Sequence, residues 1–193
     1  MQHLPTLEYG EYYHIFNRGN NREDIFREER NYEYFLSSLF HHLEKSIDVF
    51  AYCLLKNHFH LLVHIKSANH QHAHTNPQQQ FSNFFNGYAK AINKAYGRSG
   101  SLFQKRFGRK VITSQQYLVR SVCYIHCNPE IHGFVEDFRK YPHSSYHTIL
   151  DNSISRITTD EVLEWFGGVK ALEEQHHTYI KNRDFTGVDQ EPD

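Results

Sequence analysis

Aspartate and glutamate are missing from the middle of this chain. Between residues 49 and 129 the formally charged side chains are ten lysines and arginines, while the rest of the 193-residue sequence holds 11 basic and 22 acidic side chains. The net charge of −1 therefore combines a segment of +10 with a remainder of −11. Such a segment favours a bound polyanion, because cations that neutralise phosphates gain affinity by releasing counterions. A solvated basic face without a partner is the alternative interpretation.

Cysteine and long apolar runs are also scarce. The three cysteines, Cys53, Cys123 and Cys127, are an odd number with no matching second pair for a zinc site. We therefore expect buried, reduced thiols and a cytoplasmic protein, and no disulfide framework. No run approaches the ~18 consecutive apolar residues that a membrane helix needs. The first residues lack the pattern of a signal peptide, so we expect no membrane partner.

Hydrophobic periodicity predicts the helices. Apolar side chains recur every three or four residues over residues 29–45 and from about residue 78, as in amphipathic helices. Ser114 is a candidate cap for a further helix over residues 115–127, which we expect Pro129 to end.

Runs rich in β-branched and aromatic residues predict strands over residues 11–18, 49–55, 58–64 and 102–113. Lys56 and Asn57 predict a two-residue turn, which would pair the second and third of these strands in antiparallel fashion. The length predicts one main domain over residues 1–150 and a helical C-terminal appendage over residues 151–193. We expect the tail of that appendage to be disordered.

Two histidines lie two residues apart in the third predicted strand. Because successive side chains of a strand point to opposite faces, His58 and His60 share one face. Two neutral imidazoles on a rigid face can bind a divalent cation, although half-buried sheet histidines that bond to neighbours explain the same pattern. The alternating His70, His72 and His74 lie in a polar loop without a scaffold, so we expect no specific metal site there.

Tyr124 and Asn128 are four residues apart in the helix predicted after Ser114, so they lie on one face a turn apart. This pair would offer a phenol nucleophile with an amide oxygen beside it. Tyr117 and Tyr141 are rival nucleophiles, and the residues alone do not rank the three tyrosines. A helical tyrosine that only packs in the core is the simpler interpretation.

Four segments, in this order, resemble known families. Residues 57–62 (NHFHLL) resemble the histidine–hydrophobe–histidine motif of HUH single-strand nucleases. Residues 98–107 (RSGSLFQKRF), 124–129 (YIHCNP) and 141–146 (YPHSSY) resemble the REP-associated tyrosine transposases.

The resemblance implies an α+β fold, in which a central antiparallel sheet of ferredoxin or RRM-like kind carries helices on one face. It implies a metal-dependent transposase or endonuclease that cleaves and rejoins single-stranded DNA through a 5′-phosphotyrosine intermediate. Carried over to this sequence, the nucleophile is Tyr124, and the ligands of a Mg²⁺ or Mn²⁺ ion are His58, His60 and Asn128.

The expected partner is single-stranded DNA or a DNA hairpin, bound by a monomer or a homodimer. The side chains expected to bind it are Arg18, Arg22, Lys94, Arg98, Lys105, Arg106, Arg109, Lys110 and Arg120. Three alternatives stay open: a domesticated hairpin-binding protein with little or no cleavage activity, a phosphohydrolase of the histidine-triad kind, and an RNA-binding module that uses only the sheet. The spacing of His58, His60 and His64 speaks against the phosphohydrolase.

Overall fold

The computed structural model describes residues 4–67, 76–152 and 155–182. The alternating His70, His72 and His74 and the tail 184–193 lie outside these ranges. Within them, no helix is both long and apolar enough to cross a membrane. The three cysteines are free and buried, as expected.

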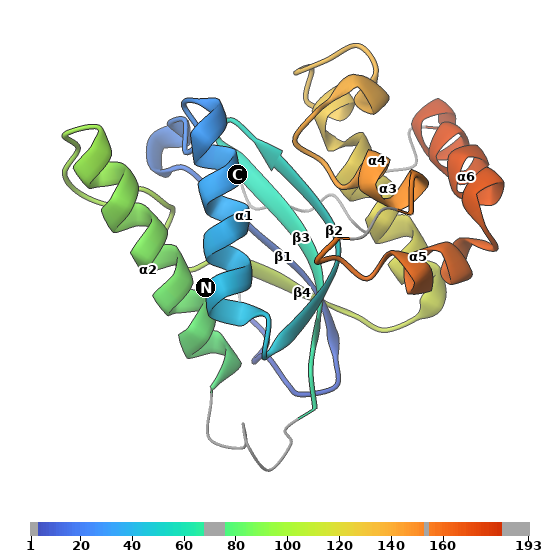
Figure 1. Cartoon of the computed structure of the whole chain (residues 1–193), viewed down its shortest axis with the longest axis horizontal. Helices are drawn as coiled ribbons and strands as arrows, with labels where there is room; N and C mark the ends of the chain where they lie inside the picture. The colour runs from blue at the N-terminus through green and yellow to red at the C-terminus, as the bar shows by residue number, and fades with distance from the viewer. Residues whose placement is uncertain (1–3, 68–75, 153–154, 183–193) are drawn as a thin grey trace.

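A four-stranded antiparallel sheet forms the centre of the molecule (Figure 1). Its strands follow the spatial order β2-β3-β1-β4, with β3 and β1 in the middle. Their bounds are Tyr12–Arg18 for β1, Ile47–Leu55 for β2, His58–Ile65 for β3 and Gly108–Ile112 for β4. Lys56 and Asn57 form the predicted turn between β2 and β3.

Helices cover both faces of this sheet. On one side lie α1 (Glu29–Leu43) and α2 (Pro77–Ala95); on the other lies α3 (Gln115–Ile131), with the shorter helices beyond it (Figure 1). These are α4 (Tyr146–Leu150), α5 (Thr159–Phe166) and α6 (Val169–Asn182), and 3₁₀ turns occupy Asn20–Arg22 and Phe138–Lys140. The predicted α+β fold with a central antiparallel sheet is therefore confirmed, but the expectation of helices on one face only is wrong.

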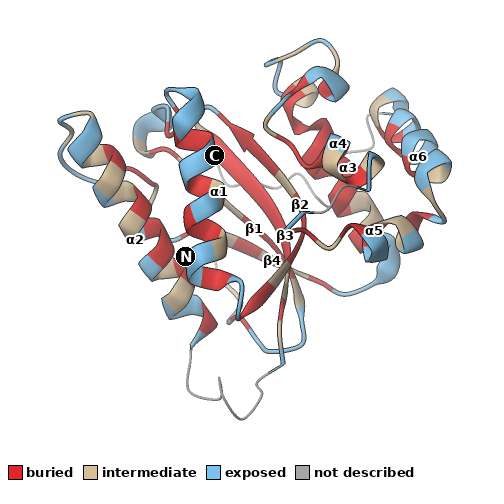
Figure 2. Cartoon of the chain, viewed as in Figure 1, coloured by how far each residue is buried: buried red, intermediate tan, exposed pale blue. Residues whose placement is uncertain are grey.

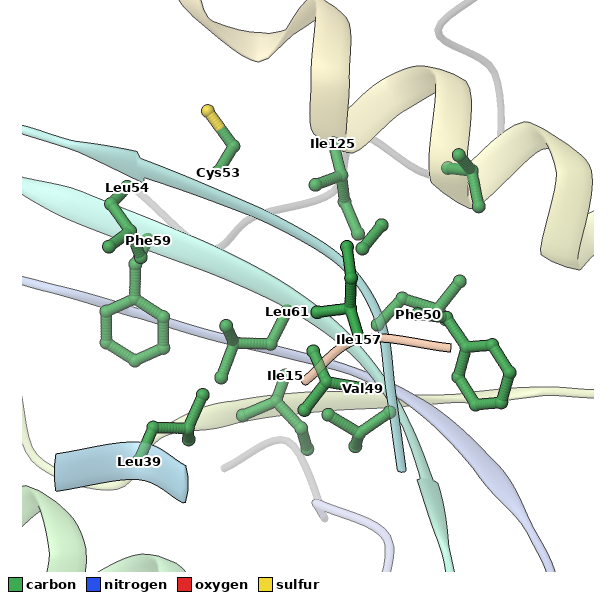
Figure 3. Packing of buried hydrophobic residues seen from close by; sticks show 14 of the residues in the cluster. Ile15, Leu39, Val49, Phe50, Cys53, Leu54, Phe59, Leu61, Ile125 and Ile157 are labelled. Carbon is green, nitrogen blue, oxygen red and sulfur yellow. The ribbon is translucent and has the colours of Figure 1, made fainter. Parts of the chain in front are cut away.

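The reason lies in β3, which is buried along both of its faces (Figure 2). Phe59 packs against the Phe35 ring of α1 and the Phe85 ring of α2, at centroid distances of 4.9 and 5.4 Å. Figure 3 shows Phe59 and Leu61 on one side of the sheet, and Ile125 of α3 on the other. A strand that is buried on both faces needs a covering layer on each side of the sheet.

Two predicted element boundaries are wrong. The stretch before Gly108 is a loop. Its Gln104 N–H donates to the Arg18 carbonyl oxygen at the end of β1 (2.9 Å), and an isolated bridge joins Gly19 and Phe103. Gly108 can open β4 because it has no side chain: a Cβ there would lie 2.2 Å from the Phe16 ring. Pro129 does not end α3, which continues to Ile131. Its burial within the helix offsets the one hydrogen bond that a proline cannot donate.

A chain of buried hydrogen bonds connects α6 to α3 and to β2. His176 Nδ1 lies 2.7 Å from the Leu172 carbonyl oxygen, and His176 Nε2 lies 2.9 Å from His126 Nδ1. His126 Nε2 lies 2.8 Å from Ser145 Oγ, which accepts a bond from the Tyr52 backbone N–H at 2.9 Å. Because a carbonyl can only accept, His176 donates from Nδ1, His126 donates to His176, and Ser145 donates to His126. The chain is satisfied while both imidazoles are neutral.

We expect acid to destabilise the fold through this pair. Burial lowers the pKa of His176 to about 4 and the pKa of His126 well below 6.5. Between pH 6.5 and pH 4 the unfolded chain therefore binds protons that the folded chain does not, so the free energy of unfolding falls as the pH falls. Each histidine contributes up to about 1.4 kcal/mol per pH unit.

Urea unfolding at pH 7, 6 and 5 measures this slope. His176→Leu is the matched variant, because it removes one titrating group and should make the slope shallower by about that amount. A wild-type free energy of unfolding that stays constant from pH 7 to pH 5 would contradict the assignment.

Candidate active site

The face of β3 that α3 covers carries both predicted histidines. His58 pairs with Arg18 and His60 pairs with Phe16 in the register with β1, so these side chains share that face. The two imidazole rings lie 5.3 Å apart between centroids, with their planes at 90°. Their exposed fractions are 3% and 0%, so the rings are withdrawn from solvent.

Helix α3 brings the predicted tyrosine and asparagine to these rings. It begins where expected, because Ser114 Oγ accepts a bond from the Tyr117 backbone N–H. Asn128 Oδ1 lies 3.2 Å from His58 Nε2. The Tyr124 ring meets His60 edge to face, at a centroid distance of 5.4 Å. The four side chains that the sequence analysis assigned to metal binding and nucleophilic attack therefore converge in one place.

His58 lies between two amide oxygens. Its Nδ1 is 2.6 Å from Asn57 Oδ1, and its Nε2 is 3.2 Å from Asn128 Oδ1. Burial, with a smaller effect from His132, lowers the pKa of His58 to about 3, so its imidazole is neutral near pH 7. A neutral imidazole has one N–H and can satisfy only one of the two oxygens.

Because His58 has one N–H for two amide oxygens, the arrangement is suited to a bound cation. Where the His58 proton resides on Nδ1, the Nε2 lone pair faces the lone pairs of Asn128 Oδ1, unless the amide group turns over. A divalent ion removes that repulsion, and 3.2 Å is close to the roughly 3.0 Å between neighbouring ligands of an octahedral shell with ~2.1 Å bonds. Asn128 Nδ2 is buried without a hydrogen-bond partner in the part of the chain that the structure describes.

The chemistry of the donors sets a limit on this site. Among residues 4–67, 76–152 and 155–182, no group of three or more His, Cys, Asp or Glu side chains could hold a metal ion. The candidate set is instead two imidazoles and one amide, His58, His60 and Asn128. Neutral nitrogen and oxygen donors suit a borderline ion such as Mn²⁺ at least as well as Mg²⁺.

The geometry also separates Tyr124 from its rivals. The Tyr141 hydroxyl donates to the Leu54 carbonyl oxygen at 2.8 Å, so this tyrosine fastens its loop to β2. Tyr117 is half-buried two turns before Tyr124 in α3, and burial raises its pKa. The Tyr124 ring, by contrast, contacts His60 of β3.

His14, which no sequence pattern singled out, belongs to the same cluster. Its Nε2 lies 2.9 Å from His60 Nδ1, and its ring meets Tyr124 edge to face at 5.7 Å. His14 is 1% exposed, and burial lowers its pKa to about 3. The alternation of the first strand placed His14 on the same face as Phe16, but nothing in the sequence showed which strand lies beside β3.

Two of the predicted basic residues line one groove. Lys105 and Arg106 are exposed and line a groove of about 480 Å³ between α2 and the loop before β4. Lys90, which the prediction omitted, lines the same groove. The exposed Arg22 and Lys94 and the half-buried Arg18, Lys110 and Arg120 lie outside its lining.

Arg109 and Arg98 have other partners. Arg109 is 8% exposed; its guanidinium bonds to the Pro5 carbonyl oxygen and to Gln78 Oε1, and it lies over the Phe107 ring. Arg98 forms an ion pair with Glu23. This guanidinium holds the N-terminal segment against α2, so it is less accessible to a phosphate chain than the exposed Lys105 and Arg106.

Comparisons with known proteins were made for sequence and for fold. No family model matches the chain. A Haemophilus influenzae protein named as a REP-associated tyrosine transposase is 31% identical over 102 residues, which make up 50% of this chain and 57% of that protein. This chain therefore covers little more than half of the length of that relative.

In fold, the chain is similar to a solved structure of a REP-associated tyrosine transposase bound to a REP hairpin. The TM-score is 0.61 at 18% sequence identity, and the match covers 80% of this chain and 87% of the other. At that identity the likeness shows a shared fold. Together the two comparisons confirm the resemblance that the motifs predict. This chain is similar to REP-associated tyrosine transposases in sequence across 50% of its length, and in fold across 80% of its length.

Proposed function

We propose that this chain is a metal-dependent transposase or endonuclease of single-stranded DNA, which cleaves and rejoins strands through a 5′-phosphotyrosine at Tyr124. The observation that carries the proposal is the convergence of Tyr124, His58, His60 and Asn128 between β3 and α3. The relative named as a transposase and the fold shared with a hairpin-bound transposase support DNA hairpins as the substrate class.

The covalent step belongs to Tyr124. Its hydroxyl oxygen attacks the scissile phosphorus and loses its proton, while the bond from phosphorus to the 3′ oxygen breaks and that oxygen gains a proton. The phosphotyrosine ester keeps the energy of the broken bond, so another 3′-hydroxyl can reverse the attack and rejoin strands without ATP. A divalent ion held by His58, His60 and Asn128 would supply Lewis-acid stabilisation of the phosphate charge.

The surroundings of the site suit a single strand. Phe134, 37% exposed, lies 6.0 Å from the His58 ring and offers an aromatic surface on which a base can stack. A separate groove between α2 and the loop before β4, whose lining contains none of the four site side chains, offers Lys90, Lys105 and Arg106 as cations that can follow a phosphate chain. The same proposal includes a cytoplasmic location and a monomer or homodimer.

A hairpin-binding protein with little cleavage activity is the second candidate. The observation that favours it is the burial of Tyr124, which is 3% exposed, because a substrate phosphate must reach a nucleophile that α3 and the sheet cover. A covalent protein–DNA adduct distinguishes the two functions.

Tyr124→Phe should abolish that adduct. The wild-type chain, incubated with a labelled single-stranded hairpin and Mn²⁺, should give a covalent band, and the variant should give none because it has no hydroxyl to hold the phosphate. Tyr117→Phe and Tyr141→Phe are the matched controls and should still form the band. Tyr141→Phe should also lose about 1 kcal/mol of stability, because its hydroxyl bonds to Leu54. Mass spectrometry that placed the adduct on Tyr117 or Tyr141 would overturn the site.

His58→Ala and His60→Ala should each abolish cleavage and leave most of the hairpin affinity in place. Each variant removes one of three candidate ligands, whereas the cations that contact phosphates remain. Cleavage assays with Mn²⁺ and gel-shift titrations measure the two quantities separately. His72→Ala, in the other His-x-His pattern, should change neither. Cleavage at the wild-type rate by either β3 variant would refute the metal site.

Affinity for a single-stranded hairpin should fall steeply with salt, and the double substitution Lys105→Gln with Arg106→Gln should flatten that dependence. Each phosphate contact with a single strand contributes about 0.7 to the slope of log affinity against log salt, so two contacts contribute about 1.4. Arg109→Gln is the control: it should leave the slope unchanged and lower the melting temperature, because Arg109 is buried. An unchanged slope in the double variant would exclude the groove as the DNA surface.

A further inference from the structure

We propose that His14 is a positioning residue of this site: it accepts a hydrogen bond from His60 Nδ1 and thereby holds His60 in the tautomer whose Nε2 can bind a cation. This inference rests on the proposed function, because it concerns how the chain prepares His60 as a ligand. It concerns a residue outside the motifs that carry the family resemblance.

The contact between the two rings is close and buried. His14 Nε2 lies 2.9 Å from His60 Nδ1, and the rings stack with a centroid distance of 5.1 Å and an interplanar angle of 29°. Both side chains are at most 1% exposed. The pair is formed across neighbouring strands, because β1 places His14 opposite Leu62, two residues beyond His60. Two central strands of the sheet therefore hold the rings in place.

The hydrogen bond between two imidazoles carries one proton, and its position determines what His60 can do. If His60 donates from Nδ1, its Nε2 has a lone pair and can bind a cation. If His14 donates instead, neutral His60 carries its proton on Nε2 and cannot bind through that atom. The hydrogen bond to His14 also fixes the orientation of the His60 ring. A hydrogen-bond partner on the second nitrogen is what orients histidine ligands in metal sites generally.

The contacts of His60 with other rings are of a different kind. The Phe16 and Tyr124 rings lie at centroid distances of 6.2 and 5.4 Å, and the His58 ring is perpendicular to it. His14 Nε2 is the nitrogen that lies at hydrogen-bond distance from His60 Nδ1. His14 Nδ1 has no hydrogen-bond partner among the described residues, so no neighbouring group fixes the His14 tautomer in competition with His60.

Nitrogen-15 NMR of the imidazole side chains tests the tautomer without any metal. In the metal-free wild-type chain at pH 7, the correlations of His60 should show a protonated Nδ1 and an unprotonated Nε2. His60 protonated on Nε2 in that sample would overturn the proposal directly. This reading does not depend on the folding of any variant.

Two variants test the position of the acceptor. The side-chain oxygen of glutamine can occupy the place of a histidine Nε2, whereas that of asparagine occupies the place of Nδ1. His14→Gln should therefore keep the Mn²⁺ dissociation constant within about threefold of wild type. His14→Asn and His14→Leu should weaken it by about ten- to a hundredfold. The free Mn²⁺ signal in electron paramagnetic resonance measures binding, and circular dichroism checks the fold.

The outcomes separate this proposal from the proposed function. Wild-type binding of Mn²⁺, combined with equal affinity in His14→Asn and His14→Leu, would overturn the role of His14 and leave the metal site intact. Equal losses in His14→Gln and His14→Asn would reduce His14 to a packing residue and also overturn it. A wild-type chain that binds no Mn²⁺, yet keeps His60 protonated on Nδ1, would refute the metal site and support the tautomer assignment.

Discussion

The structure depends on burying two imidazole side chains in the otherwise apolar strand β3. β3 is buried on both faces, and two imidazoles interrupt the face beneath α3. Withdrawing such rings from water is unfavourable unless their nitrogens find partners. Asn128 Oδ1 on α3 and His14 Nε2 on β1 lie 3.2 and 2.9 Å from the rings of His58 and His60. The contacts that allow the histidines to be buried are therefore those that gather the candidate ligands beside Tyr124.

Helix α3 makes polar contacts on two of its sides. Tyr124 and Asn128 point to β3, while His126, midway between them along the chain, bonds to His176 of α6 and to Ser145. A helix buried on most of its circumference gains stability from every side, so it can include a proline near its end. The C-terminal helices thus support the candidate site from a distance, because they hold the outer side of the helix that carries Tyr124 and Asn128.

Most of the fold and the core of the site could be predicted from the sequence, because local patterns determine them. Strand alternation placed His58 and His60 on one face of a strand, and helical spacing placed Tyr124 and Asn128 on one face of a helix. His14 escaped because its role depends on which strand lies beside β3, a long-range pairing that no local pattern reveals. The burial of Arg109 escaped for the same reason: charge along the chain does not show that a guanidinium folds back onto Pro5.

Burial constrains the chemistry as strongly as it constrains the fold. Charges interact more strongly where water is excluded, so in the proposed reaction the enclosure of Tyr124 between β3 and α3 would strengthen the stabilisation of a phosphate in its transition state. The same enclosure restricts entry. The exposed His132, Gly133 and Phe134 follow directly after the end of α3 and border the His58 ring. Since a duplex presents its phosphates on a broad, stiff surface, the proposed function requires an unpaired and flexible strand to pass this border.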